Sequence, residues 1–204
     1  MLSVFSTILL PIVLVAALGY LLARWGRLDP GPIARTTFYL FSPCLVFVTL
    51  ATSTTAPDLL GRLALLKLLG YAMLVPAAGG LAGRLRLSAP ASSAFVLAAA
   101  FANSGNYGLS VNEYAFGSAG LALAVICYVT DNLVLNSLGV YLAARGHAGA
   151  RQALGQVVRN PALYAVILGV AVNRGGWAVP TLLLRPLEML GRAAVPTMLV
   201  VLGM

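Results

Sequence analysis

Long apolar runs separated by short polar or basic segments form the dominant pattern along the chain. A transmembrane helix needs about 20 mostly apolar residues. Seven segments meet this requirement: Val4–Ala23, Ile33–Leu50, Leu63–Gly83, Pro90–Phe116, Ala119–Ala143, Ala153–Asn173 and Leu187–Met204. The loops between these segments are short and leave no room for a soluble domain. The pattern therefore predicts an all-α polytopic membrane protein.

The composition supports this prediction. Hydrophobic residues make up 60% of the chain and charged residues 9%, against about 45–50% and about 25% in soluble domains. This is too little charge to cover a water-facing surface, which excludes an ordinary soluble enzyme, a disordered tail and a nucleic-acid-binding module. Cys44 and Cys127 lie in apolar runs without a metal-binding spacing. We therefore predict the lipid bilayer as partner, with no metal, no cofactor and no nucleic acid.

Positive residues are distributed unevenly between alternate loops. The loops after the first, third and fifth spans contain eight arginines, and those after the second, fourth and sixth contain two. Cytoplasmic loops carry the excess of basic residues, so the N-terminus is predicted outside the cell membrane. Lys67, Arg185 and Arg192 lie near predicted outer span ends, where long side chains can snorkel to the interface.

Proline and glycine markers recur between the first two and the last two spans. The pairs are Pro11 and Pro161, Gly19 and Gly169, and Pro30 and Pro180, offset by 150 residues, and Pro43 and Pro196, offset by 153. A unit that restarts at the sixth span has five spans, and an odd number inverts the second copy. Such repeats are common in secondary transporters. We predict a first five-helix repeat at 1–145 and an incomplete second repeat at 151–204; chance recurrence is the alternative.

The fourth predicted span is interrupted near its middle. Asn103–Ser110 contains two Gly, two Asn and two Ser, which are poor helix formers. The preceding half-helix, Ala91–Ala102, covers about 18 Å and reaches roughly the middle of the hydrocarbon core. A break at that depth is tolerated only where it lines an enclosed cavity. The alternative is a kink that only helps helices to pack.

The chemistry of this interruption suits an anionic ligand. Free N–H groups at the start of the second half-helix favour a carboxylate. Amide side chains add uncharged donors and acceptors, and glycines let a ligand approach the backbone. The predicted substrate-binding residues are Asn103, Ser104, Gly105, Asn106, Tyr107, Gly108 and Ser110.

A polar face on the fifth span is predicted to turn toward the interruption. Tyr128, Asp131, Asn132 and Asn136 share one side of a helix. A carboxylate at mid-membrane depth is costly and indicates function. We predict that Asp131, with Asn132, forms the coupling site for a proton or for a cation such as sodium. The alternative is a structural carboxylate that is hydrogen-bonded to the broken helix.

The segment Asn103-Ser-Gly-Asn-Tyr-Gly-Leu-Ser110 resembles the signature of the auxin efflux carrier family of membrane permeases. Further segments resemble its bacterial members, namely Glu113–Gly117, Asn136–Val140, Asn160–Pro161 and Ala193–Pro196. The resemblance implies ten helices in two inverted five-helix repeats, with broken fourth and ninth helices that cross at the substrate site. It also implies a fold similar to bile-acid/sodium symporters and organic-anion substrates such as auxins or dicarboxylates. Two positions depart from the family pattern: Ser110 replaces a proline, and Glu113 replaces an apolar residue.

The leading hypothesis is a secondary transporter that moves a small organic anion by alternating access. No catalytic residue is predicted, since the sequence shows neither a nucleophile with a base nor a close pair of carboxylates. A non-transporting ligand sensor or scaffold is the main alternative, and an intramembrane enzyme is less favoured. A homodimer is a further possibility that the sequence leaves undecided.

The repeat offset also predicts a longer protein. A second copy that starts near residue 151 is expected to finish near residue 300, so about seven of ten expected helices are present in these 204 residues. We expect the isolated chain to be a truncated part, inactive as a monomer unless a partner chain supplies the remaining helices.

Overall fold

A computed structural model describes residues 5–139, 155 and 157–204, and all regular structure in these residues is helical. The predicted all-α architecture is confirmed for this part of the chain. The helices and π-helical turns (η) are η1 (Phe5–Leu9), α2 (Leu10–Gly26), α3 (Pro30–Thr36), η2 (Thr37–Phe41), α4 (Ser42–Ala51), α5 (Pro57–Arg84), α6 (Ala89–Ala100), η3 (Ser104–Gly108), α7 (Leu109–Val134), η4 (Leu135–Gly139), α10 (Pro161–Gly175) and α11 (Thr181–Gly203).

Five helical segments of the described residues are long and apolar enough to cross a membrane. They are Phe5–Gly26, Pro30–Ala51, Asp58–Arg84, Ala89–Leu138 and Thr181–Gly203, and α10 is a shorter apolar helix. The segment Ala89–Leu138 has 50 residues and contains the fourth predicted span and the fifth as far as Leu138. Each of the seven predicted spans therefore contains helical structure in its described part; residue 4 of the first, the fifth beyond residue 139, and residues 153, 154 and 156 of the sixth lie outside the described residues.

The sixth span begins later than the hydrophobic pattern indicates. Asn160 has an extended backbone (φ −76°, ψ 115°), as expected for a residue before proline. Its side-chain oxygen accepts the N–H of Ala162 at 3.0 Å and so caps the first turn of α10. The capped helix therefore starts at Pro161.

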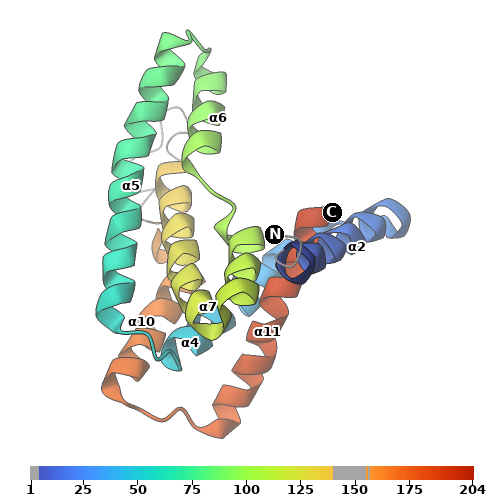
Figure 1. The fold of residues 1–204 in the computed structure, drawn as a ribbon, viewed down its shortest axis with the longest axis vertical. Helices are drawn as coiled ribbons and strands as arrows, with labels where there is room; N and C mark the ends of the chain where they lie inside the picture. Colours follow the sequence, from blue (N-terminus) through green and yellow to red (C-terminus); the bar gives the residue numbers. More distant parts are fainter. Residues whose placement is uncertain (1–4, 140–154, 156) are drawn as a thin grey trace.

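Gly117 folds α7 into a hairpin of two helical arms (Figure 1). Its φ of 64° and ψ of −152° interrupt the helix, and a positive φ is readily adopted only by glycine. Gly120, just after the turn, lies against the first arm: a Cβ there would be 2.5 Å from Cβ of Phe116 and 2.6 Å from the carbonyl oxygen of Asn112. The two arms are thus closely packed and act as one unit.

The described helices form two groups (Figure 1). In the first, which we call the wall helices, α11 packs on α2 and on α4, and α10 packs on α4. In the second, the hairpin helices, α5 packs on α6 and on the α7 hairpin, and η3 packs on α7. The interrupted fourth span therefore belongs to the hairpin helices and faces the wall helices.

Two glycines allow close contacts within the wall helices. A Cβ on Gly19 of α2 would lie 2.1 Å from the carbonyl oxygen of Val200 in α11. A Cβ on Gly169 of α10 would lie 3.0 Å from the carbonyl oxygen of Phe47 in α4. Helices within membranes commonly approach each other through such small residues.

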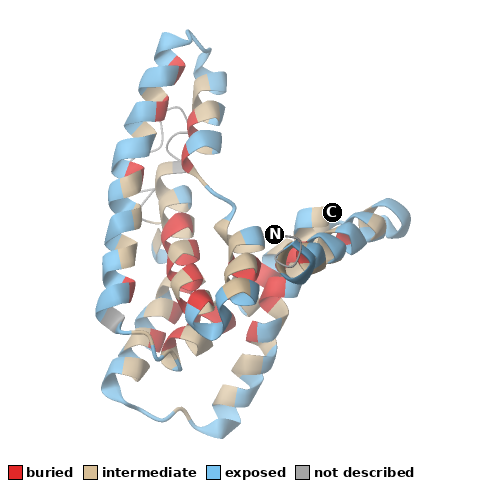
Figure 2. Cartoon of the chain, viewed as in Figure 1, coloured by how far each residue is buried: buried red, intermediate tan, exposed pale blue. Residues whose placement is uncertain are grey.

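Burial is concentrated in the second arm of α7 and in its contacts with α4 and α11, while α2 and α5 are largely exposed (Figure 2). The core includes Val46, Leu109, Val125 and Ala194. The outer face of α5 presents large apolar side chains, among them Leu65, Leu66, Leu69, Met73 and Leu74. An apolar outer surface of this kind is suited to lipid rather than to water.

Candidate functional site

The fourth span is broken where the sequence predicts it. α6 ends at Ala100, and Phe101 (φ −105°, ψ 120°) and Asn103 (φ −79°, ψ 67°) are not helical. The second half-helix starts with η3 at Ser104. The side-chain oxygen of Asn103 accepts the N–H of Asn106 at 3.2 Å, so Asn103 is the cap of the second half-helix.

Asp131 lies next to this break and is buried. Tyr71 donates a hydrogen bond to one carboxylate oxygen at 2.5 Å, and Ser104 donates one to the other. Nζ of Lys67 lies 2.7 Å from the first oxygen and 3.0 Å from the second. Three side chains from two elements therefore surround the carboxylate, and we call Asp131, Lys67, Tyr71 and Ser104 the carboxylate cluster.

The ion pair corrects the expectation for Lys67. Its side chain was predicted to snorkel to the outer interface, but it points to Asp131 and is only 26% exposed. Lys67 is near the middle of α5, and a charge at that depth is favourable only with a partner. The signal in the sequence was one lysine in the third span and one aspartate in the fifth, each a charge within an apolar segment. Their separation of 64 residues gave no indication that they meet.

α5 also supports the other side of the break. The rings of Tyr71 and Phe101 are stacked, with centroids 4.9 Å apart and an interplanar angle of 29°. Nζ of Lys67 is 5.6 Å from the centroid of the Tyr71 ring, within the range of a cation–π contact. Phe101, which follows the first half-helix, thus contacts Tyr71 of α5. Ser104, the first residue of the second half-helix, contacts Asp131, which is itself paired with Lys67 of α5.

Tyr128 connects the break to the wall helices. Its hydroxyl forms a 2.6 Å hydrogen bond with the hydroxyl of Ser42 at the start of α4. Its ring covers the backbone of η3: a Cβ on Gly105 would lie 2.8 Å from Cε2 of Tyr128. Glycine is therefore required at this position for the ring to approach the half-helix.

Two neighbouring cavities lie at the break. One of about 240 Å³ is lined by Phe101–Asn106, Tyr128, Asp131, Asn132 and Leu135. The other, of about 200 Å³, is lined by Ala34, Thr37, Phe38, Asn106, Tyr128, Asn132, Met198 and Val201. They share Asn106, Tyr128 and Asn132, so the break faces both the carboxylate cluster and the wall helices. We call them together the break cavities.

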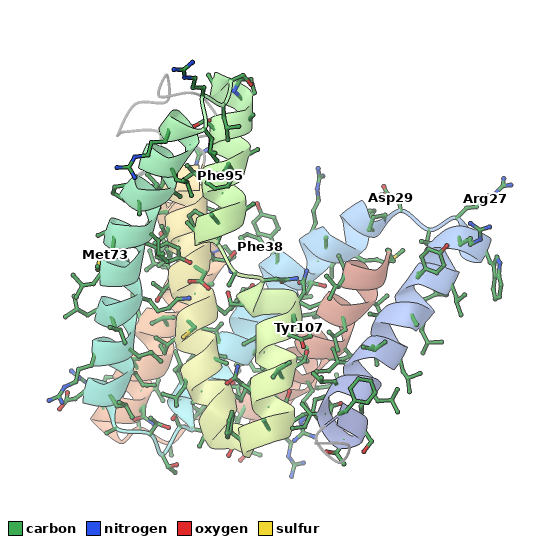
Figure 3. All side chains as sticks on the ribbon, turned by 45° about the horizontal axis from the view of Figure 1, so that its top comes forward. Arg27, Asp29, Phe38, Met73, Phe95 and Tyr107 are labelled. Atoms are coloured by element: carbon green, nitrogen blue, oxygen red, sulfur yellow. The ribbon has the colours of Figure 1, made fainter. Side chains whose placement is uncertain are left out.

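The predicted substrate-binding residues divide into two sets. Asn103, Ser104, Gly105 and Asn106 line the break cavities, and Asp131 and Asn132 face them from α7. Tyr107 is exposed, on the η3 turn that follows the break (Figure 3). Gly108 and the fully buried Ser110 lie in the half-helix and do not line these cavities.

The family model described as membrane transport protein matches residues 4–204. The chain belongs to this family, that of the auxin efflux carriers. An uncharacterized transporter of Methanothermobacter thermautotrophicus is 31% identical to this chain over 208 residues, which cover 98% of this chain and 67% of the relative. The chain is therefore a multi-pass membrane transport protein, as its apolar helices also indicate.

In this member of the auxin efflux carrier family, the interrupted span is lined by polar side chains. No group of three or more His, Cys, Asp or Glu side chains that could hold a metal ion occurs in the described ranges. The polar side chains that line the break cavities include three asparagine amides (Asn103, Asn106 and Asn132), the Tyr128 hydroxyl and the Asp131 carboxylate, which is paired with Lys67 behind it. Such groups are suited to a ligand that is held by hydrogen bonds and by charge.

Proposed function

We propose that the chain is part of a secondary transporter that carries a small organic anion across the cell membrane by alternating access. The observation that carries the proposal is the interrupted fourth span, whose polar residues line one cavity within the hairpin helices and another between these and the wall helices. Unpaired backbone groups at membrane depth are tolerated where they line a cavity. In secondary transporters, broken helices of this kind bind substrate near the midplane.

An anion fits the break for electrostatic reasons. The half-helix that starts at Ser104 directs its first N–H groups toward the break, and a helix N-terminus favours negative charge. Asp131 faces the same cavity, but Lys67 lies against both of its oxygens. The pair carries no net charge, so a substrate carboxylate does not meet an uncompensated negative group.

The contacts of the two glycines support the inverted repeat. Gly19 and Gly169 are offset by 150 residues, and the residues they contact, Val200 and Phe47, are offset by 153. These are the offsets of the proline markers. The first span of one copy thus contacts the second span of the other in both cases. We propose repeats at 1–145 and 151–204, with a boundary that lies outside the described residues.

Asp131 and Asn132 are the proposed coupling residues. The carboxylate cluster connects α5, the break and α7, so an ion that changes the contacts of Asp131 also changes those of Ser104. A proton or a sodium ion that binds here would thereby alter the start of the half-helix that holds the substrate. Coupling and substrate binding would share one structural element.

The test is uptake by the full-length gene product in proteoliposomes. Purified protein is first screened with carboxylates by thermal shift, and those that stabilise it are then offered in radiolabelled form, with proton and sodium gradients imposed separately. We expect accumulation against a gradient for at least one carboxylate. Binding without accumulation under either gradient would indicate a ligand sensor and would exclude the transporter.

A further inference from the structure

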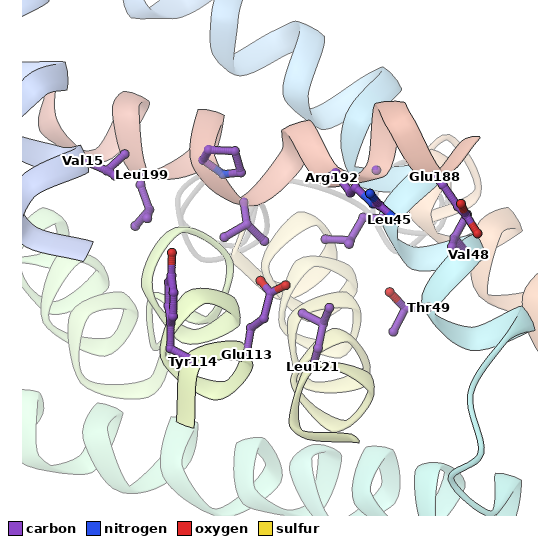
Figure 4. Close-up of a pocket in the computed structure, with 13 residues that line it drawn as sticks. Val15, Leu45, Val48, Thr49, Glu113, Tyr114, Leu121, Glu188, Arg192 and Leu199 are labelled. Carbon is purple, nitrogen blue, oxygen red and sulfur yellow. The ribbon is translucent and has the colours of Figure 1, made fainter. Parts of the chain in front are cut away.

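A second and larger cavity lies between the two groups of helices, away from the break. Its volume is about 490 Å³. The α7 hairpin contributes Glu113, Tyr114 and Leu121 on one side, and α2, α4 and α11 form the other side (Figure 4). Most of its lining is aliphatic, but it contains the charged residues Glu113, Glu188 and Arg192. We call it the intergroup cavity.

The charges of this cavity are not paired in the conformation described. The ion pairs recorded for the described ranges are Lys67 with Asp131 and Arg174 with Asp58. Glu113, on the hairpin, and Arg192, on α11, carry opposite charges on opposite sides of the cavity. Glu188 precedes Arg192 by one helical turn and is on the same helix.

Closure of the cavity would make the unpaired charges costly. Gly120 holds the two arms of the hairpin together, so Glu113 moves with the hairpin helices as one unit. If this unit approaches α11, Glu113 leaves water for a lining of Val195, Pro196 and Leu199. A charge buried among aliphatic groups needs a partner, and Arg192 is the one cation among the described residues of the lining.

We propose that Glu113 and Arg192 form a gate, an ion pair that assembles when the hairpin helices close on α11 and separates when the intergroup cavity opens. The gate rests on the proposed alternating access and adds to it the residues that stabilise one of the two states. It also gives a function to Glu113, which stands where the auxin efflux carrier pattern has an apolar residue. Glu188, one helical turn before Arg192, has the same charge as Glu113 and therefore cannot be its partner.

The gate is tested by the accessibility of the cavity, which needs no substrate. Thr49 lines the cavity from α4, so Thr49→Cys in a Cys44→Ala, Cys127→Ala background provides a single reactive thiol. Its labelling by a membrane-impermeant maleimide is measured in proteoliposomes. We expect Glu113→Gln and Arg192→Gln each to raise the labelling rate by about fivefold or more, since coupling energies of this kind correspond to such factors.

A charge exchange with a matched control makes the test specific. Glu113→Arg combined with Arg192→Glu is expected to restore the original labelling rate. Glu113→Arg combined with Arg185→Glu also leaves the net charge unchanged, but Arg185 does not line the cavity. This combination is therefore expected to keep the raised labelling rate of the single variants. Equal rates in all variants, or equal restoration by both combinations, would overturn the gate.

A second measurement is independent of charge. Glu113→Cys with Arg192→Cys, in the same cysteine-free background, is expected to form a disulfide under mild oxidation, which requires Cα atoms within about 7 Å. Glu113→Cys with Arg185→Cys is the control and is expected to form none. No disulfide in the first variant would count against closure. If the disulfide forms but the protein shows no uptake, the transport proposal is rejected, while the approach of positions 113 and 192 is supported.

Discussion

Asn103 and Asn106 are three residues apart and have different roles at the break. The side-chain oxygen of Asn103 caps the second half-helix. Asn106 lines both break cavities, and no hydrogen bond of its side chain is recorded within the described ranges. The amide of Asn106 is therefore the better candidate for a direct contact with substrate, and Asn103 orients the N–H groups around it.

Asn106→Ala is expected to raise the substrate concentration for half-maximal uptake about tenfold, because a hydrogen bond to a charged group contributes about 1.5–3 kcal/mol. Asn103→Ala removes a cap and is expected to lower stability by about 1 kcal/mol as well as affinity. Uptake and thermal unfolding of the purified variants measure the two effects. Asn103→Ser, which keeps a capping oxygen, is the control. Wild-type uptake and affinity in both alanine variants would exclude the break as the binding site.

The carboxylate cluster gives a prediction about coupling. Asp131→Asn is expected to weaken the dependence of uptake on a proton or sodium gradient, and it leaves Lys67 without its partner. Loss of one partner of a buried ion pair costs about 3–5 kcal/mol, whereas removal of both is often nearly neutral. Thermal unfolding should therefore show Lys67→Met combined with Asp131→Asn to be more stable than Asp131→Asn alone.

The double variant also separates coupling from structure. If Asp131 is only structural, the Lys67→Met and Asp131→Asn combination recovers both stability and gradient-dependent uptake. If Asp131 couples, stability recovers while the gradient dependence stays lost. Intact gradient dependence in either transporting variant would show that another group carries the coupling.

At the scale of helices, Gly19 of α2 and Gly203 of α11 allow these two helices to pack closely, since a Cβ on Gly203 would lie 1.8 Å from the carbonyl oxygen of Ala16. Gly19→Ala would place a methyl group 2.1 Å from a backbone oxygen of Val200, and backbone cannot move aside as a side chain can. Overpacking of this kind typically costs about 1–3 kcal/mol, so the unfolding temperature is expected to fall. Gly61→Ala is the control, since nothing lies within 4 Å of that position and alanine favours a helix. Equal unfolding temperatures in the two variants would contradict the contact.

The break itself could be predicted from the sequence because it depends on local properties. Gly105, Gly108 and the asparagines are poor helix formers, and the depth of the interruption follows from the length of the half-helix before it. The polar face of α7 was predicted by periodicity, and Asp131 and Asn132 do face the broken span.

The partners across helices could not be predicted in the same way. Lys67 meets Asp131, and Tyr128 meets Ser42, across 64 and 86 residues of chain. Periodicity gives the face of a helix but not the helix that it faces. Gly117, by contrast, lies in the two-residue gap between the fourth and fifth predicted spans, and its positive φ forms the turn of the hairpin there.

At the scale of the whole molecule, the ends of the helices form two layers. Asn173 of α10 donates hydrogen bonds to the carbonyl oxygens of Ala51 and Ser53 after α4, at 3.2 and 2.8 Å. Arg174 lies 3.4 Å from Asp58 at the start of α5. The loops after the second and sixth spans therefore lie at the same end of the molecule, as an alternating topology requires.

Arg27 and the turn between α5 and α6 lie at the other end (Figure 3). This end contains Arg24, Arg27, Arg84 and Arg86, and basic residues favour the cytoplasmic side. We therefore expect the N-terminus of the protein to be outside the cell membrane. Thr54 and Ala178 should face outward, and Leu28 and Leu87 should face the cytoplasm.

Single cysteines introduced at these four exposed positions test the orientation, in the Cys44→Ala, Cys127→Ala background. We expect an impermeant maleimide added to intact cells to label Thr54→Cys and Ala178→Cys, and to label Leu28→Cys and Leu87→Cys only after the membrane is permeabilised. Two loops are tested on each side. Those with Thr54 and Ala178 lie at the same end of the molecule, and those with Leu28 and Leu87 are both basic. The opposite labelling pattern would place the basic loops outside the cell and would reverse the expected orientation. If intact cells were labelled at only one position of each pair, loops would not alternate between the two sides of the membrane. That result would contradict the topology that the inverted repeat requires.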